Sequence, residues 1–273
     1  MNPHNYINQK HTMNIKQLHR LKEQQEKIAC LTVYDASFAK LAINAGVEVL
    51  LVGDSLGMTV KGYPSTLSVS INDILHHLKA VNNIQQNKFI IADMPFMSYS
   101  NLSQTLDNAT RLMQNGANMV KLEGENHVID YTYNLSSHGI PVCGHLGLQP
   151  QLINKISHYT LQATTDIEAD NLINAAVSLQ EAGAEMLILE MIPAKLAAKV
   201  TKKLTIPVIG IGAGVDTDGQ ILVSYDMLGI TSTKLPSFVR NFTLTTNSIP
   251  QAIEIYVQSV KNKSFPSPEY IPG

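Results

Sequence analysis

The amino-acid sequence predicts a (β/α)8 barrel. Short apolar runs alternate with longer amphipathic stretches along nearly the whole chain. The runs are rich in Val, Ile and Leu without clean polar alternation, which is typical of parallel strands covered on both faces. The length of 273 residues is close to the roughly 250 usual for this fold. We therefore expect one barrel domain over 1–273, with a polar helical extension over about 1–26 and a loose tail over about 262–273.

Seven apolar runs are predicted to be strands, and an eighth strand is plausible in 219–228, although that segment also suits a short helix. Right-handed crossovers make such consecutive strands parallel neighbours. A doubly wound open sheet is the alternative, but its glycine-rich fingerprint does not follow the first strand. The seven runs are 27–35, 48–54, 88–96, 118–124, 140–147, 185–192 and 206–214.

Helical patterns fill the gaps between these strands. Ser70 with Asp73 three residues later predicts a capped helix start. Gly116 and Gly183 each follow an amphipathic stretch, as glycines at helix ends commonly do. The expected helices are 70–85, 102–117, 171–185 and 194–204.

Composition narrows the class of protein. Hydrophobic residues make up 44% and charged residues 15%, against about 25% charged in typical domains, so a large core is expected. A net charge of −2 argues against nucleic-acid or anionic-membrane partners. The polar N-terminus lacks a signal peptide, which predicts a cytoplasmic protein. Cys30 and Cys143 lie in apolar runs, which favours buried thiols over a catalytic cysteine.

Charged and polar side chains stand where the predicted strands end. In a (β/α)8 barrel the carboxyl ends of the strands form the active site. We therefore expect these side chains to converge on one pocket. They are Asp54 and Ser55 after the second strand, Asp93 on the third, Lys121 and Glu123 on the fourth, His145 on the fifth and Glu190 on the sixth.

The three acids Asp54, Asp93 and Glu123 predict a metal site. Carboxylates that share a pocket repel one another and resist ionisation. A divalent cation removes that conflict, and oxygen-only ligands favour Mg²⁺. In the alternative interpretation each acid caps a helix or pairs with a nearby lysine.

Three further residues are candidates for binding and catalysis. Lys121 shares a strand face with Glu123, so it is expected to pair with acids and to hold a substrate carboxylate. Glu190, flanked by apolar residues, is a candidate general base or a cap of the following helix. His145 is either a site histidine or a satisfied core histidine. The glycines of "GIGAG" predict a close backbone approach, which in many barrels serves phosphate.

These residues lie in segments that resemble the ketopantoate hydroxymethyltransferase family, and the likeness runs from about 27 to about 242. The most specific segments are "LVGDSLGMTV" and "GHLGLQPQ". Others are "ADMPFMSY", "GANMVKLEG" and "IPVIGIGAGVDTDGQILVSYDMLGI". The resemblance implies a phosphoenolpyruvate/pyruvate-type (β/α)8 barrel, Mg²⁺, 5,10-methylenetetrahydrofolate as co-substrate and a homodecamer.

The resemblance also implies roles and a reaction. It assigns metal binding to Asp54, Asp93 and Glu123, substrate binding to Asp54, Ser55, Asp93 and Lys121, catalysis to Glu190 as base, and a site role to His145. The implied reaction transfers a hydroxymethyl group to 3-methyl-2-oxobutanoate and gives 2-dehydropantoate for pantothenate synthesis. The alternatives are another Mg²⁺-dependent α-keto-acid C–C lyase or phosphomutase, or a non-catalytic small-molecule-binding protein.

Three loops depart from the family pattern. They are "EGEN" (123–126), "KISHY" (155–159) and "GITSTKLPSF" (229–238). These departures affect what can be expected of folate binding and loop closure. They do not affect the predicted metal ligands Asp54, Asp93 and Glu123.

Overall fold

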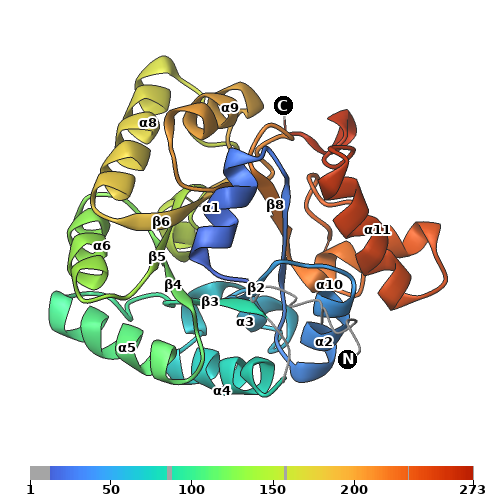
Figure 1. The fold of residues 1–273 in the computed structure, drawn as a ribbon, viewed down its shortest axis with the longest axis horizontal. Coiled ribbons are helices and arrows are strands. Elements are labelled where there is room, and N and C mark those ends of the chain that lie inside the picture. The colour runs from blue at the N-terminus through green and yellow to red at the C-terminus, as the bar shows by residue number, and fades with distance from the viewer. Residues whose placement is uncertain (1–12, 85–87, 157–158, 233, 273) are drawn as a thin grey trace, which may run out of the picture.

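The computed structural model describes residues 13–84, 88–156, 159–232 and 234–272, in which eight parallel strands close into a barrel (Figure 1). Neighbours follow chain order from β1 to β8, and β8 pairs with β1. The predicted (β/α)8 barrel is confirmed. The strands are β1 Ile28–Thr32, β2 Val49–Val52, β3 Phe89–Asp93, β4 Met119–Glu123, β5 Val142–Gly147, β6 Ala184–Glu190, β7 Val208–Ile211 and β8 Gly219–Leu222.

Apolar side chains on both strand faces explain the continuous hydrophobic runs. In β2, Val49 and Leu51 belong to the cluster that fills the barrel interior. Leu50 and Val52 belong to the second cluster, which lies between the strands and the surrounding helices. A two-residue period along each strand divides the core into these two layers.

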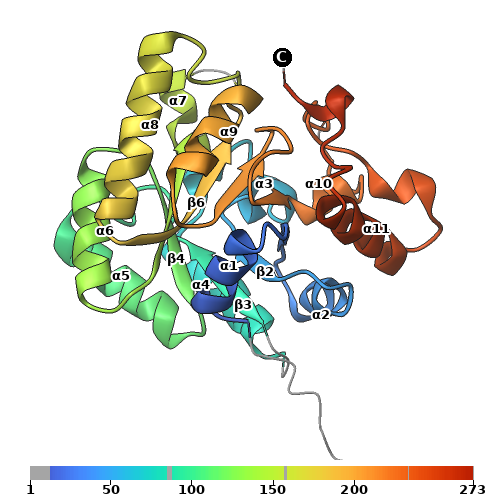
Figure 2. The same cartoon turned by 45° about the horizontal axis from the view of Figure 1, so that its top comes forward.

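The main helices surround the barrel (Figures 1 and 2). The predicted capping box of Ser70 and Asp73 begins α4. A second box, Thr165 with Glu168, begins α8 five residues before the predicted start at 171. The helices are α2 Ala36–Asn44, α3 Leu56–Thr59, α4 Ile71–Asn82, α5 Leu102–Gln114, α6 His127–Ser137, α7 Ile153–Ile156, α8 Asp166–Glu181, α9 Ala194–Lys203, α10 Ser224–Met227 and α11 Ile249–Lys261.

The N-terminal extension covers the amino ends of the strands. Within it the structure describes α1, Ile15–Glu23, and residues 1–12 lie outside the described part. Leu18 of α1 is fully buried in the interior cluster. Lys22 forms an ion pair of 2.7 Å with Asp218, just before β8 begins. The opposite, carboxyl end of the barrel is therefore the end that is left for a site.

Two expectations need correction. The segment 219–228 is neither wholly strand nor wholly helix, because β8 ends at Leu222 and α10 follows it. The C-terminal tail is not loose over its first residues, because Phe265 is only 2% exposed and its ring packs edge-on against Phe242 and Tyr256. Burial of this aromatic ring fixes the segment.

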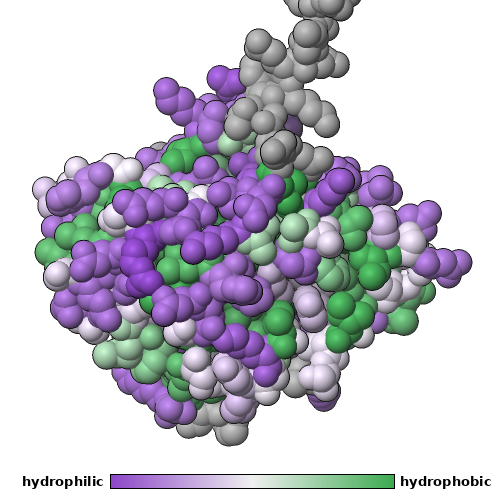
Figure 3. Space-filling model, turned by 90° about the horizontal axis from the view of Figure 1, so that it is seen from below, coloured by the Kyte–Doolittle hydropathy of each residue, from purple (hydrophilic) through white to green (hydrophobic). Residues whose placement is uncertain are grey.

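The face in Figure 3 is largely hydrophilic, with hydrophobic side chains scattered between the polar ones. No helix in the described ranges is both long enough and apolar enough to cross a membrane.

Candidate active site

All seven predicted site residues line one cavity of about 520 Å³ at the carboxyl end of the barrel. Strand register brings them together, because Asp93 lies opposite Lys121, Glu123 opposite His145, and Gly147 opposite Glu190. Asp54 and Ser55 follow directly after β2 and complete the set.

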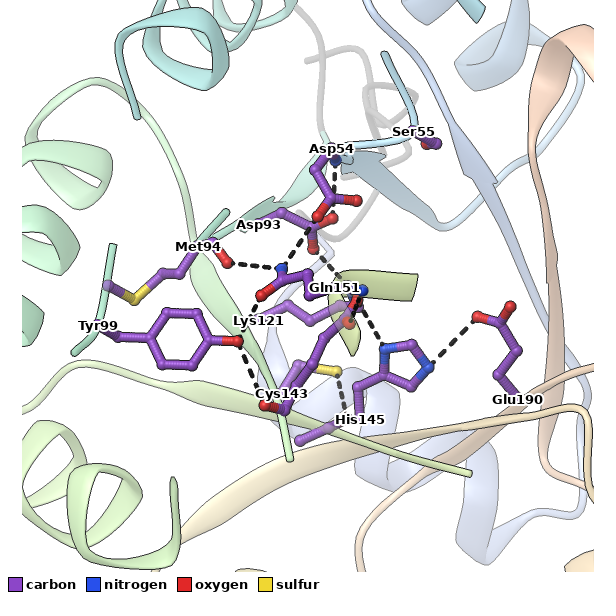
Figure 4. Close-up of polar contacts among 12 residues, drawn as sticks. Asp54, Ser55, Asp93, Met94, Tyr99, Lys121, Cys143, His145, Gln151 and Glu190 are labelled. Carbon is purple, nitrogen blue, oxygen red and sulfur yellow. Dashed lines mark hydrogen bonds and ion pairs between the residues drawn. The ribbon is translucent and has the colours of Figure 1, made fainter. Parts of the chain in front are cut away.

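Lys121 is the central cation of the cluster (Figure 4). Its Nζ lies 2.7 Å from Asp93 Oδ1 and 3.2 Å from Glu123 Oε1. The lysine is only 5% exposed and Asp93 only 2%. Burial opposes a charge here, but the carboxylates of Asp93 and Glu123 outweigh burial and raise the pKa of Lys121 well above its ordinary value. Lys121 is therefore a fixed positive charge.

His145 connects two carboxylates. Its Nδ1 lies 3.1 Å from Glu123 Oε1 and its Nε2 lies 3.3 Å from Glu190 Oε2, both at ion-pair distance. Although burial lowers its pKa, Glu123 outweighs burial and raises the pKa of His145 to about 9. Burial likewise opposes ionisation of Glu123, yet Lys121 and His145 lower the pKa of Glu123 to about 2. The imidazolium and the Glu123 carboxylate are both charged at neutral pH.

Gln151 is a site residue that sequence reasoning missed. Its Nε2 donates to Asp54 Oδ2 at 2.9 Å and to the Met94 carbonyl at 3.1 Å, while its Oε1 accepts from the Tyr99 hydroxyl at 2.6 Å. Its backbone N–H donates to Glu123 Oε2 at 3.3 Å. The available signal was its place in "GLQPQ", directly after β5.

Asp54 carries negative charge that the cluster does not fully compensate. Its backbone N–H donates to Asp93 Oδ2 at 2.9 Å, which holds the two acids side by side. Burial, followed by the charges of Asp93 and Glu123, raises the pKa of Asp54 well above its ordinary value despite Lys121 and the Gln151 hydrogen bond. Such a carboxylate is stabilised in its ionised form by an added cation.

The donor set fits a magnesium ion held by few protein ligands. Among the described residues, no group of three or more His, Cys, Asp or Glu side chains is arranged to hold a metal. Glu123 already contacts three groups, His145, Lys121 and the Gln151 N–H. Within the described residues each Asp93 oxygen contacts a single donor, Lys121 Nζ or the Asp54 N–H, and Asp54 accepts from Gln151 at Oδ2. Mg²⁺ commonly uses one or two carboxylates and completes its shell with water and substrate oxygens. Asp54 and Asp93 supply that number of carboxylates.

Ser55 lies on the cavity wall apart from the charged network (Figure 4). Its Oγ is 2.8 Å from the Tyr34 hydroxyl, to which Thr32 Oγ1 donates at 3.1 Å. Burial raises the pKa of Tyr34 to about 12. Ser55 therefore joins a chain of neutral hydroxyl groups.

The "GIGAG" glycines allow protein segments to approach each other. Gly212 has a φ of +58°, and a Cβ there would lie 2.9 Å from Met191 Sδ and 3.1 Å from the Phe238 ring.

The two cysteines are free and buried, and burial raises the pKa of Cys143 to about 12. A buried, protonated thiol agrees with the expectation that neither cysteine is a nucleophile.

Two of the departing loops contribute to the cavity wall. Tyr159 of the 155–159 loop lines the cavity, whereas residues 157–158 lie outside the described part. The 229–238 loop, described apart from residue 233, contributes Thr231, Lys234 and Phe238 among others.

Sequence comparison finds relatives over nearly the whole chain. The model of a family described as ketopantoate hydroxymethyltransferase matches residues 12–268. A Psychromonas ingrahamii protein is 48% identical over 258 residues, covering 94% of this chain and 98% of the relative. A Nitrosococcus oceani protein is 52% identical over 255 residues, covering 93% and 97%. Both are named 3-methyl-2-oxobutanoate hydroxymethyltransferase.

Solved structures share the fold at low identity. A 2,3-dimethylmalate lyase, described as a PEP mutase/isocitrate lyase superfamily member, has a TM-score of 0.56 at 16% identity, covering 79% of this chain and 82% of that one. A phosphonopyruvate hydrolase, solved with oxalate and Mg²⁺, has a TM-score of 0.59 at 12% identity, covering 77% and 81%. These similarities agree with the (β/α)8 fold of the chain.

Proposed function

Because the chain belongs to the ketopantoate hydroxymethyltransferase family, we propose that it transfers a hydroxymethyl group from 5,10-methylenetetrahydrofolate to 3-methyl-2-oxobutanoate. The products are 2-dehydropantoate and tetrahydrofolate, and one water supplies the hydroxyl oxygen. The observation that carries the proposal is the convergence of Asp54, Asp93, Lys121, His145 and Glu190 on one cavity of this family member.

Glu190 is the proposed general base. It takes the proton from C3 of the keto acid, and the resulting enolate forms the new C–C bond with the one-carbon unit. Its Oε2 faces His145 Nε2 at 3.3 Å, so the imidazolium orients the carboxylate and leaves Oε1 for the proton. A positioned base of this kind accounts for about 10²–10⁴-fold of a rate enhancement.

The remaining site residues are proposed to bind the keto acid and the metal ion. Lys121 has three N–H donors, of which Asp93 and Glu123 engage two, so one remains for the substrate carboxylate. Ser55 offers a neutral hydroxyl to the same substrate. Asp54 and Asp93 are the proposed Mg²⁺ ligands, and Glu123 would add its negative charge to the site. A bound Mg²⁺ supplies Lewis-acid polarisation of the keto group.

The test separates proton abstraction from carbon transfer. Protein with Mg²⁺ and 3-methyl-2-oxobutanoate in deuterated water is followed by NMR for loss of the C3 proton, and methylenetetrahydrofolate is then added. We expect C3 exchange before the folate and 2-dehydropantoate after it, with both lost when a chelator removes the metal. Exchange without transfer indicates another α-keto-acid enzyme. Keto-acid binding with neither reaction indicates a non-catalytic binding protein.

We also propose a homodecamer in the cytoplasm without nucleic-acid or membrane partners. The family resemblance supports the assembly, and the net charge of −2 supports the lack of polyanionic partners. Light scattering on the eluting protein should give ten times the mass of one chain. A smaller mass at micromolar concentration would contradict the decamer.

A further inference from the structure

The cavity has a second side, formed after β8. Here its wall consists of residues of α10 and of the loop that follows, including Asp226, Thr231, Lys234 and Phe238. Asp226 is partly buried, and its carboxylate accepts a hydrogen bond from Thr231. Among the described residues, no Lys, Arg or His forms an ion pair with Asp226.

Asp226 differs in this from the acids on β3, β4 and β6. Asp93 and Glu123 pair with Lys121, and Glu190 pairs with His145. Burial raises the pKa of Asp226 to about 6, and the Thr231 hydrogen bond offsets only part of that effect. Within the described residues the cavity wall thus holds a carboxylate without a cationic partner, and a ligand can supply further hydrogen-bond donors to it.

We propose that Asp226 binds the pyrimidine ring of the tetrahydrofolate co-substrate by accepting hydrogen bonds from ring N3–H and the 2-amino group. These two donors point the same way in one plane, as the two N–H groups of a guanidinium do, and a carboxylate accepts such a pair bidentately. The inference rests on the proposed function, which requires a folate in this cavity.

The surroundings suit a flat ring with a polar edge. Met58, Met191, Leu222 and Phe238 give the same cavity apolar walls. Pockets for organic ligands commonly combine such walls with a few polar groups that fix orientation. Asp226 and the Glu190 cluster line one cavity of about 520 Å³, so the folate ring and the keto acid share a compartment.

The experiment measures tetrahydrofolate binding by calorimetry to wild type, Asp226→Asn and the control Asp107→Asn. Asp107 is exposed on α5 and lies outside this cavity. An amide cannot accept both donors, so we expect Asp226→Asn to weaken binding about 10- to 100-fold. Asp107→Asn should bind tetrahydrofolate as tightly as wild type. Asp226→Asn should still exchange the C3 proton of the keto acid at the wild-type rate, which also shows that this variant is folded.

A ligand analogue provides a second test, because two ligands can then be compared on two protein variants. 2-Desamino-2-methyltetrahydrofolate lacks one of the two donors, so wild type should bind it less tightly than tetrahydrofolate, while Asp226→Asn should discriminate little between them. Tetrahydrofolate binding of wild-type strength in Asp226→Asn, or equal binding of the two ligands by wild type, overturns the inference. The analogue comparison on wild type decides the matter if the variant does not fold. If wild type exchanges C3 but does not bind tetrahydrofolate, the proposed function fails as well.

Discussion

The two sides of the cavity hold their charges differently. The strand side consists of Asp54, Asp93, Lys121, Glu123, His145 and Glu190, and the loop side of the described residues in 223–238. On the strand side, Lys121 and His145 each contact two carboxylates. On the loop side, Asp226 has Thr231 as a neutral partner and Lys234 is exposed.

The difference follows from what positions each side chain. Parallel register fixes neighbouring strand ends, so charges on β3, β4 and β5 meet in one arrangement. Such preorganised charges suit chemistry, because they need no rearrangement as charge develops. The described residues of α10 and of the loop after it make no ladder hydrogen bonds to a neighbouring strand, which suits ligand recognition. We therefore expect the keto acid to bind and react on the strand side and the folate ring to be recognised on the loop side.

The largest expected effect tests which side carries the reaction. Glu190→Gln should lower kcat about 10²–10⁴-fold and slow C3 exchange in parallel, because the amide cannot take the proton. Circular dichroism and Mg²⁺ binding on the same sample establish that the variant is folded. Glu254→Gln, exposed on α11, is the matched control. Exchange at the wild-type rate in Glu190→Gln would place the base elsewhere, with His145 the first candidate.

The same substitution at two lysines compares the sides directly. Lys121→Met leaves Asp93 and Glu123 buried without their cation, so the free energy of unfolding should fall by about 3–5 kcal/mol. The KM for the keto acid should rise as well. Lys234→Met should change stability by no more than about 0.5 kcal/mol. Urea titrations measure both, and equal losses would remove the distinction between the two sides.

Gln151 lies in a short 3-10 helix after β5, Pro150–Leu152, and tests whether a residue outside the strands belongs to the strand side. Gln151→Ala leaves Asp54 Oδ2, the Met94 carbonyl and the Tyr99 hydroxyl with fewer partners, which should cost about 1–3 kcal/mol of stability. Gln258→Ala on the exposed face of α11 serves as control. Loss of the same size in both variants would indicate that the buried hydrogen bonds of Gln151 contribute nothing.

The smallest expected effect is a gain in the free energy of unfolding, not a loss. The pKa of Asp226 is about 6 in the folded chain and about 3.9 when unfolded, so its contribution to stability is present below about pH 3.9 and is lost as pH rises through about 6. Asp226→Asn should therefore stabilise the ligand-free protein by about 1–2 kcal/mol at pH 7.5, since partial exposure reduces the full effect. The gain should vanish below pH 4. Denaturation at both pH values measures it, and a gain independent of pH would contradict the assignment.

The barrel and the residues at the strand ends could be predicted from the sequence alone. Both features are local, because apolar runs mark buried strands and the charges that follow Val52 or lie at Asp93 stand at fixed places along the chain. The capping box at Ser70 is equally local. The resemblance of "GHLGLQPQ" to one family added roles that no periodicity contains.

Which side chains contact one another could not be predicted from the sequence and depends on the three-dimensional fold. The pairing of Lys121 with Asp93 depends on the alignment of β3 with β4. Gln151 donates a hydrogen bond to Asp54 although the two residues are 97 positions apart in the sequence. The lack of a cationic partner for Asp226 among the described residues and the burial of Phe265 likewise depend on how distant segments pack. Local patterns state that a residue is charged or apolar, but its partner is set by the path of the whole chain, because contact energies act in space and not along the sequence.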